Sequence, residues 1–291
     1  MIVWPNSLIE DIARRNCVIF LGSGISCNSK NADGVKPKSW RVLLEHGAST
    51  YIGDHALKDL IIKKISEGDY LLACELLKRG MGEEPFSDYL KAEYLDKQFE
   101  VATIHKTIFD LDARIVISPN VDEIYETYAK MQTKGSTIVK TYKDNDITDV
   151  IRTGSFLIIK SHGTISNARE VIFTSNDYAQ IRNKYREFYD IMNSLILTQT
   201  FLFLGAGLND PDIKLLMENY SFRYKYSRKH QFVIPSDAMS NEEERIYSDL
   251  LNMNFLKYDR SDEHKELKDS LVDLVALVSA KRDELSKKQN W

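Results

Sequence analysis

The chain has 291 residues, of which 43% are hydrophobic and 28% are charged. This composition supplies enough apolar residues for a full core, so it excludes a disordered chain and a small disulfide-stabilised domain. The 39 basic and 43 acidic residues leave a formal net charge of −4, which gives no electrostatic basis for binding nucleic acid. We expect a single domain over residues 1–291.

The three cysteines are far apart in the sequence and form no C-x-x-C pair. A cysteine-based zinc ribbon is therefore excluded, and we expect no bound metal. The first residues show no basic leader followed by an apolar core, and the longest apolar runs are far shorter than the roughly 18 residues of a membrane helix. The sequence predicts a cytoplasmic protein without membrane contact.

Short apolar runs that end in turn residues recur along the chain. They cover Cys17–Leu21 and residues 114–117, 156–159, 201–204 and 231–234. Unbroken runs of this length, rich in Val, Ile and Phe, are typical of strands buried on both faces. Helical patterns lie between them, and this alternation predicts right-handed crossovers. We expect an α/β fold with a Rossmann-like parallel sheet flanked by helices.

Apolar residues at helical spacing predict the elements between these strands. Asn6 is the expected N-cap of a first helix, and Asp210 and Pro211 suit the cap and first turn of a helix after the fourth strand. Residues 51–107 contain no strand pattern, so they predict a helical insertion after the first strand. Residues 263–287 predict one long amphipathic helix.

Two glycine-rich turns follow predicted strands. The first has the sequence GSGIS, and the second is the GAG turn with Gly205 and Gly207. Glycine lets a backbone approach a pyrophosphate closely, and a helix start offers free N–H groups. The dinucleotide fingerprint G-x-G-x-x-G is incomplete, because Cys27 stands at the third glycine. The first turn alone is therefore equally compatible with a tight strand-to-helix turn that binds nothing.

Polar residues follow the second and third predicted strands. Asn120 and Asp122 can orient water or a ribose hydroxyl, but both are also preferred helix caps. His162 is the strongest general-base candidate among six histidines, although a lone histidine is more often structural. In an open parallel sheet, ligands bind beyond the carboxyl ends of the strands. We expect these residues and both glycine turns to meet at that edge.

The four segments, in this order, resemble the sirtuin family. They are most similar to its divergent bacterial branch, the sirtuin-like NAD hydrolases of anti-phage defence found with HerA-type ATPases or in Thoeris-type systems. The segments are GSGIS, SPNVD, HG and GAGLNDPD, and the resemblance covers about residues 10–235. Protein-deacylating sirtuins carry a four-cysteine zinc module and a P-D-F-R segment, which are both missing here. Their glutamine before the asparagine is replaced by Pro119.

The resemblance implies cleavage of NAD to nicotinamide and ADP-ribose through an oxocarbenium-like state. It implies that Asn120 positions the ribose or the attacking water, that Asp122 holds the nicotinamide carboxamide, and that His162 accepts a proton. The residues that it implies for NAD binding are Gly22, Ser23, Gly24, Ser26, Gly205, Gly207 and Asn209. No metal cofactor is implied.

Two alternatives remain at this point: NAD-dependent ADP-ribosyl transfer or deacylation on a protein, and a non-catalytic nucleotide-binding subunit of a defence complex. A free NAD hydrolase would harm its own cell, and the residues after position 234 are too few for a separate sensing domain. We therefore expect control by assembly, either as a homo-oligomer or with a HerA-type hexameric ATPase, the partner that the resemblance implies.

Overall fold

A seven-stranded parallel sheet forms the centre of the computed structural model, which describes residues 1–208, 210–224 and 227–288. The strand order is β3-β4-β2-β1-β5-β6-β7. The strands are β1 (Cys17–Leu21), β2 (Ile115–Ser118), β3 (Ile138–Thr141), β4 (Leu157–Lys160), β5 (Thr200–Leu204), β6 (His230–Pro235) and β7 (Met253–Tyr258). All five predicted runs form strands, and the Rossmann-like α/β fold is confirmed.

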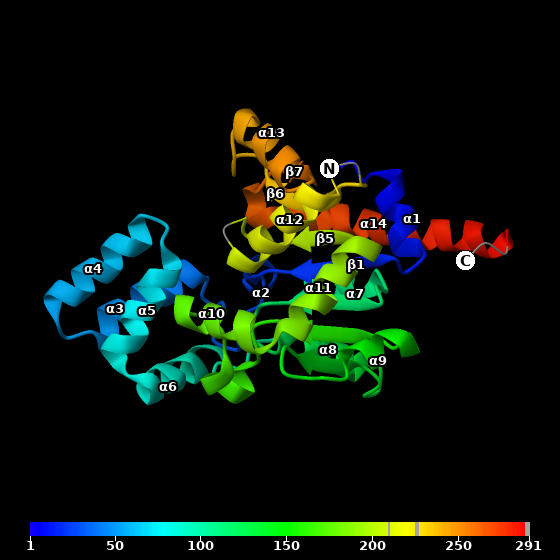
Figure 1. Ribbon diagram of the computed structural model, residues 1–291. Helices are drawn as coiled ribbons and strands as arrows, with labels where there is room; N and C mark the ends of the chain where they lie inside the picture. Colours follow the sequence, from blue (N-terminus) through cyan, green and yellow to red (C-terminus); the bar gives the residue numbers. More distant parts are fainter. Residues whose placement is uncertain (209, 225–226, 289–291) are drawn as a thin grey trace.

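The central strands are mostly apolar because helices cover both faces of the sheet (Figure 1). In β1, Ile19 packs into the core on one face and Phe20 into the core on the other. One face is covered by α1 (Asn6–Ala13), α7 (Thr103–Asp110), α8 (Ile124–Gln132) and α14 (Ser261–Lys287). The other is covered by α9 (Ile147–Thr153), α10 (Ser175–Lys184), α11 (Arg186–Thr198), α12 (Pro211–Arg223) and α13 (Asn241–Leu250).

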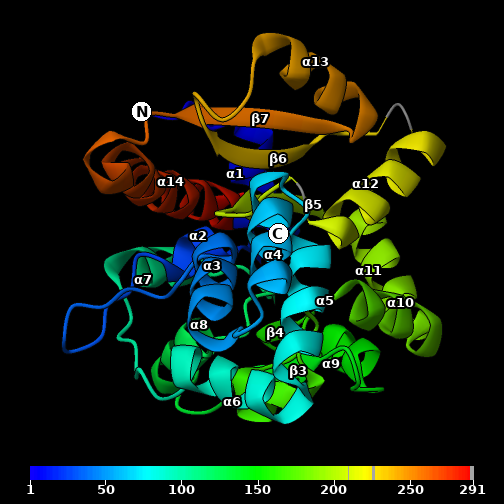
Figure 2. The same cartoon turned by 90° about the vertical axis from the view of Figure 1, so that its left-hand side faces the viewer.

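A separate helical layer projects from one end of the sheet, and Figure 2 views it from the front. It consists of α3 (Trp40–Tyr51), α4 (His55–Ser66), α5 (Tyr70–Met81) and α6 (Glu83–Tyr94). These helices surround their own apolar core, which also includes Ile165 and Ala168 from a short 3₁₀ helix, η1 (Ile165–Glu170). The division of the chain into one domain with an insertion at residues 51–107 stays a prediction.

The helix ends follow the expected capping chemistry only in part. Asp210 Oδ1 accepts a hydrogen bond of 3.2 Å from the Ile213 N–H, as predicted for the cap of α12. The N-cap prediction for Asn6 was wrong: Pro5 is the N-cap and Asn6 is the first helical residue. Pro5 is extended, with a ψ of 135°, and its carbonyl accepts hydrogen bonds from the N–H groups of Leu8 and Ile9, so the helix begins after it. No helix among the described residues has the length and apolar character of a membrane span.

Candidate active site

A cavity of about 280 Å³ lies at the carboxyl edge of the sheet, beyond the ends of β1, β2, β4 and β5. Strand order reverses at β1, because the chain continues from β1 towards β2 on one side and later adds β5 on the other. Ligands of open α/β sheets bind at such a switch point. Of the predicted site residues, seven line the cavity: Gly22, Ser23, Ser26, Asn120, Asp122, His162 and Gly207.

The two glycine turns pack directly against each other. The Gly22 N–H donates to the Leu204 carbonyl over 2.9 Å, and the Gly24 N–H donates to the Gly205 carbonyl over 3.0 Å. A Cβ on Gly22 would lie 2.3 Å from the Gly205 oxygen, and Gly205 itself has a φ of +63°. Gly24 and Gly205 do not line the cavity. Glycine is therefore required here for the contact between two loops, whatever the cavity binds.

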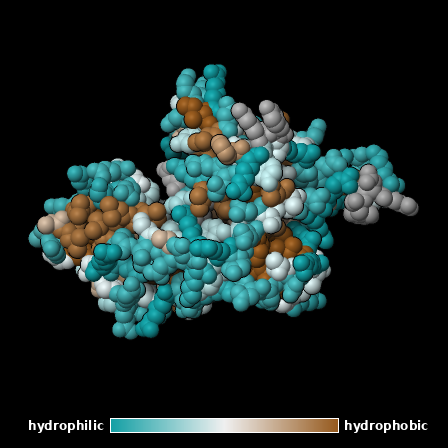
Figure 3. Space-filling view, viewed as in Figure 1, coloured by the Kyte–Doolittle hydropathy of each residue, from teal (hydrophilic) through white to brown (hydrophobic). Residues whose placement is uncertain are grey.

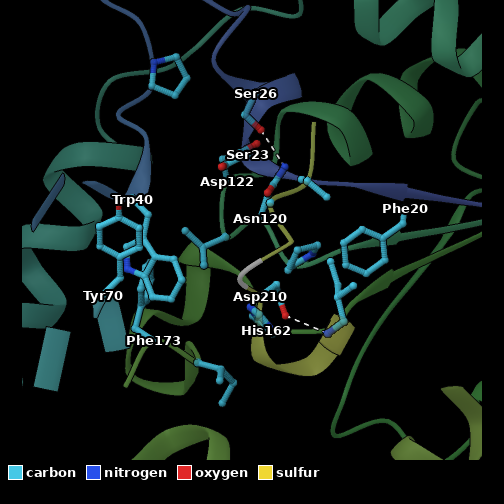
Figure 4. A pocket seen from close by; sticks show the side chains of 18 of the residues that line it. Phe20, Ser23, Ser26, Trp40, Tyr70, Asn120, Asp122, His162, Phe173 and Asp210 are labelled. Carbon is cyan, nitrogen blue, oxygen red and sulfur yellow. Dashed lines mark hydrogen bonds between the residues drawn. The ribbon is translucent and has the colours of Figure 1, made fainter. Parts of the chain in front are cut away.

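Asn120 connects the loop after β2 to the first glycine turn. Its side-chain Nδ2 donates to Ser26 Oγ over 3.0 Å (Figure 4), and its main-chain N–H donates to Ser118 Oγ over 3.3 Å. Both Asn120 and Ser26 face the cavity. The side chain is thus held in place at the junction of two strand ends.

Asp122 is buried and serves in two ways. Its Oδ1 accepts a 3.2 Å hydrogen bond from the N–H of Ile124 at the start of α8, whose N-cap is Glu123 and not Asp122. It also lines the cavity. Burial raises the pKa of the nearby Cys27 thiol and Asp122 raises it further, so Cys27 stays protonated at neutral pH. A cysteine nucleophile at this edge is therefore disfavoured.

His162 lies two residues beyond β4 and is 7% exposed. Its ring meets the Tyr178 ring edge-on, with 5.1 Å between the centroids and 78° between the planes. Its main-chain carbonyl accepts a 3.0 Å hydrogen bond from the Ile172 N–H. Gly163, the next residue, has a φ of +80°, a backbone conformation that glycine adopts without strain. His162 is therefore held at the cavity wall, near Asp210 (Figure 4).

An aromatic wall, which the sequence did not predict, closes the cavity on the side of the helical layer. It consists of Trp40, Tyr70 and Phe173 (Figure 4). The Trp40 ring lies 5.7 Å from the Tyr70 ring and 6.4 Å from the Phe173 ring, centroid to centroid. Asp210, predicted only as a helix cap, also lines the cavity.

Two further predictions concern Asn209 and metal ions. Asn209, predicted to bind the cofactor, lies outside the described residues. Among residues 1–208, 210–224 and 227–288, no three His, Cys, Asp or Glu side chains gather as a metal site would require. The binding roles of the predicted residues stay predictions.

Chelation tests the expected independence from metals. We expect the purified chain to keep its melting temperature after treatment with EDTA, because the predicted site consists of an amide, a carboxylate and an imidazole and the fold is expected to need no metal. Differential scanning fluorimetry and elemental analysis measure this. About one zinc ion per chain, lost together with the fold on chelation, would contradict it.

Comparison with known proteins finds a family model that matches part of the chain. Residues 114–258 match the model of the SIR2-like domain. The matched segment contains the loop with Asn120 and Asp122 and the HG dipeptide at His162, so the predicted resemblance to sirtuins is confirmed.

Curated relatives of this chain include a defense-associated sirtuin and proteins named NAD(+) hydrolase. Defense-associated sirtuin 2 of Bacillus subtilis is 23% identical over 242 residues, which are 82% of this chain and 22% of that protein. The NAD(+) hydrolase ThsA of Enterococcus faecium is 22% identical over 227 residues, or 77% of this chain and 44% of its own. The ThsA of Bacillus cereus is 21% identical over 236 residues, with 80% and 46% covered. The chain thus spans less than half the length of these relatives.

Proposed function

We propose that this SIR2-like chain hydrolyses NAD to nicotinamide and ADP-ribose, and that it acts as an effector of anti-phage defence by depleting NAD. The observation that carries the proposal is the meeting of Asn120, Asp122 and His162 at one cavity, at the switch point of the sheet. The relatives named NAD(+) hydrolase support the same reaction.

The proposed reaction breaks the bond between ribose C1′ and the nicotinamide nitrogen, and the bonding electron pair leaves with nicotinamide. The ribose passes through an oxocarbenium-like state, which water attacks at C1′. Asn120 orients the water or the ribose, and Asp122 holds the nicotinamide carboxamide. His162 accepts the proton that the water loses as ADP-ribose forms.

The cavity is assigned to the reacting end of NAD. Its volume of about 280 Å³ is close to the lower end of the roughly 300–1,000 Å³ found for ligand pockets. A dinucleotide exceeds this space, so we place the adenosine end at the mouth, near Gly207. A Cβ at Gly207 would meet nothing within 4 Å, which leaves room there.

Incubation of the purified chain with NAD tests the proposal. We expect nicotinamide and free ADP-ribose in equal amounts, measured by liquid chromatography, with NADP as a parallel substrate. Nicotinamide without free ADP-ribose would indicate transfer to a protein instead. If NAD stays intact at every protein concentration and with the products of neighbouring genes added, the chain is a nucleotide-binding subunit without catalysis.

We also propose that assembly controls the activity. Figure 3 shows apolar side chains gathered over the helical layer, where Leu60, Ile62 and Leu72 are 41%, 38% and 37% exposed. On α14, Val272 is 56% exposed. These surfaces are assigned to a second copy of the chain or to a HerA-type ATPase, although packing on the sheet accounts for much of α14.

Substitution on the helical layer tests this control. We expect Leu60→Glu with Leu72→Glu to lower activity and shift its dependence on protein concentration, because charge on an apolar contact weakens assembly. Neither residue lines the cavity. Light scattering and nicotinamide release are measured over the same concentration range. Full activity of a dilute parent monomer, with no partner present, would refute control by assembly.

A further inference from the structure

A buried ion pair lies beneath the cavity, outside the residues assigned to the reaction so far. Lys160 ends β4 and is 0% exposed, and its partner Glu126 on α8 is 4% exposed. Lys160 Nζ lies 2.5 Å from Glu126 Oε1. Removing two charged groups from water costs free energy, so this buried pair calls for a role other than stability.

The same ammonium group also holds the loop that carries Asn120 and Asp122. Lys160 Nζ donates a 2.5 Å hydrogen bond to the main-chain carbonyl of Asp122. Its own backbone continues directly to His162, two residues later. One residue therefore contacts the loop after β2 through its side chain and positions the loop after β4 through its main chain.

Two other hydrogen bonds join the loop after β2 to the segment after β4, and neither involves the Asp122 carbonyl. The Ile165 N–H donates to the Val121 carbonyl over 2.8 Å. The Thr164 hydroxyl donates to Glu123 Oε1 over 2.7 Å. Neither contact reaches the carbonyl of Asp122, which precedes the first turn of α8. Lys160 therefore orients that peptide, whereas the Asp122 side chain is held by the Ile124 N–H.

We propose that Lys160 is a positioning residue for the proposed hydrolysis and that it fixes the main chain at Asp122 relative to His162. The inference rests on the proposed function of the same cavity. Glu126 has a different part: it neutralises the buried ammonium group and does not itself contact the loop carbonyl. The two members of the pair are therefore unequal for catalysis, although both are buried.

The difference between the two members gives the test. Lys160→Met removes the hydrogen bond to Asp122 but leaves Glu126 buried and unpaired. Burial already raises the pKa of the Glu126 carboxyl, and the Lys160 charge opposes that rise. The double variant Lys160→Met with Glu126→Met removes both charges, and such replacements commonly preserve folding. Glu126→Gln keeps the lysine and its hydrogen bond but leaves the buried ammonium group without its counter-charge, so its melting temperature should fall while the contact to Asp122 persists.

We expect the double variant to keep the parent melting temperature and to lose at least about 30-fold in kcat, with KM changed less than about threefold. Glu126→Gln should stay within about threefold of the parent kcat. Lys140→Met on the neighbouring strand β3 is the control, because Lys140 pairs only with exposed or half-exposed carboxylates away from the cavity. It should leave kcat unchanged.

Amide hydrogen exchange provides a readout that does not depend on turnover. Residues 119–124 should exchange faster in the double variant than in the parent, while the strands keep their protection. If the parent releases no nicotinamide, the proposed function fails, and this exchange alone decides the role of Lys160. Parent-like kcat and exchange in the double variant would overturn the inference, as would equal losses in Lys160→Met and Glu126→Gln. Unfolding of the double variant would also count against it.

Discussion

Replacement of Asn120 or His162 by alanine is expected to lower nicotinamide release at least about 100-fold, the scale of losing a positioned acid–base group. Asn120 lies where the loops after β1 and β2 meet, and His162 lies at the end of β4, so both face the same space. His162→Ala removes the proposed proton acceptor. Asn120→Ala removes the group that orients the ribose or the water.

The fold should survive both substitutions. Each side chain lies at a strand end and not in one of the three apolar cores. Suitable controls are His55→Ala at the exposed start of α4 and Asn183→Ala on the exposed surface of α10. Circular dichroism and thermal melting establish folding, and chromatography of nicotinamide measures the reaction. Parent-like turnover in either active-site variant would mean that the site is assigned wrongly.

Gly22→Ala is expected to have the largest effect on stability. The added Cβ would lie 2.3 Å from the Gly205 oxygen and 2.4 Å from the Ala206 Cα, and both are backbone atoms that cannot turn away. The turns would have to separate, which breaks the 2.9 Å hydrogen bond from the Gly22 N–H to Leu204. We expect a loss of roughly 3 kcal/mol or more in the free energy of unfolding.

Gly207→Ala is the matched control, because it lies in the second glycine turn but has open space at the Cβ position. Its melting temperature should stay within a few degrees of the parent, whereas Gly22→Ala should fall by roughly 6–12 °C. Thermal unfolding monitored by circular dichroism compares them. Equal stability of the two variants would show that the turns tolerate separation, and the structural requirement for glycine would not hold.

The inner strands could be predicted from sequence because both of their faces are buried. The runs in β1 and β2 have every residue buried, so the apolar pattern is unbroken. The edge strand β3 has half-buried residues throughout and includes Lys140, so its sequence carries no such run. It becomes a strand through pairing with β4, which is a tertiary contact.

The candidate site divides in the same way. Asn120, Asp122 and His162 could be predicted because each follows a strand whose carboxyl end must lie at one edge of the sheet. Trp40 and Phe173 could not, because they are 133 positions apart in the sequence and meet only when the helical layer docks. The proposed role of Lys160 could not be predicted from the sequence either, because a lysine at the end of a strand is ordinarily exposed to solvent.

The cavity lies between two parts of the molecule, the sheet and the helical layer, each with its own apolar core. Trp40, Tyr70 and Phe173 pack against the core of the helical layer, whereas Asn120 and His162 follow strands of the sheet. The walls therefore come from two different apolar cores, and the segment at Ile172 and Phe173 joins them, because the Ile172 N–H donates to the His162 carbonyl. The outer surfaces of α4 and α5 belong to the same packed layer as the aromatic wall. We expect a molecule bound there to change the width of the cavity without contacting Asn120 or His162.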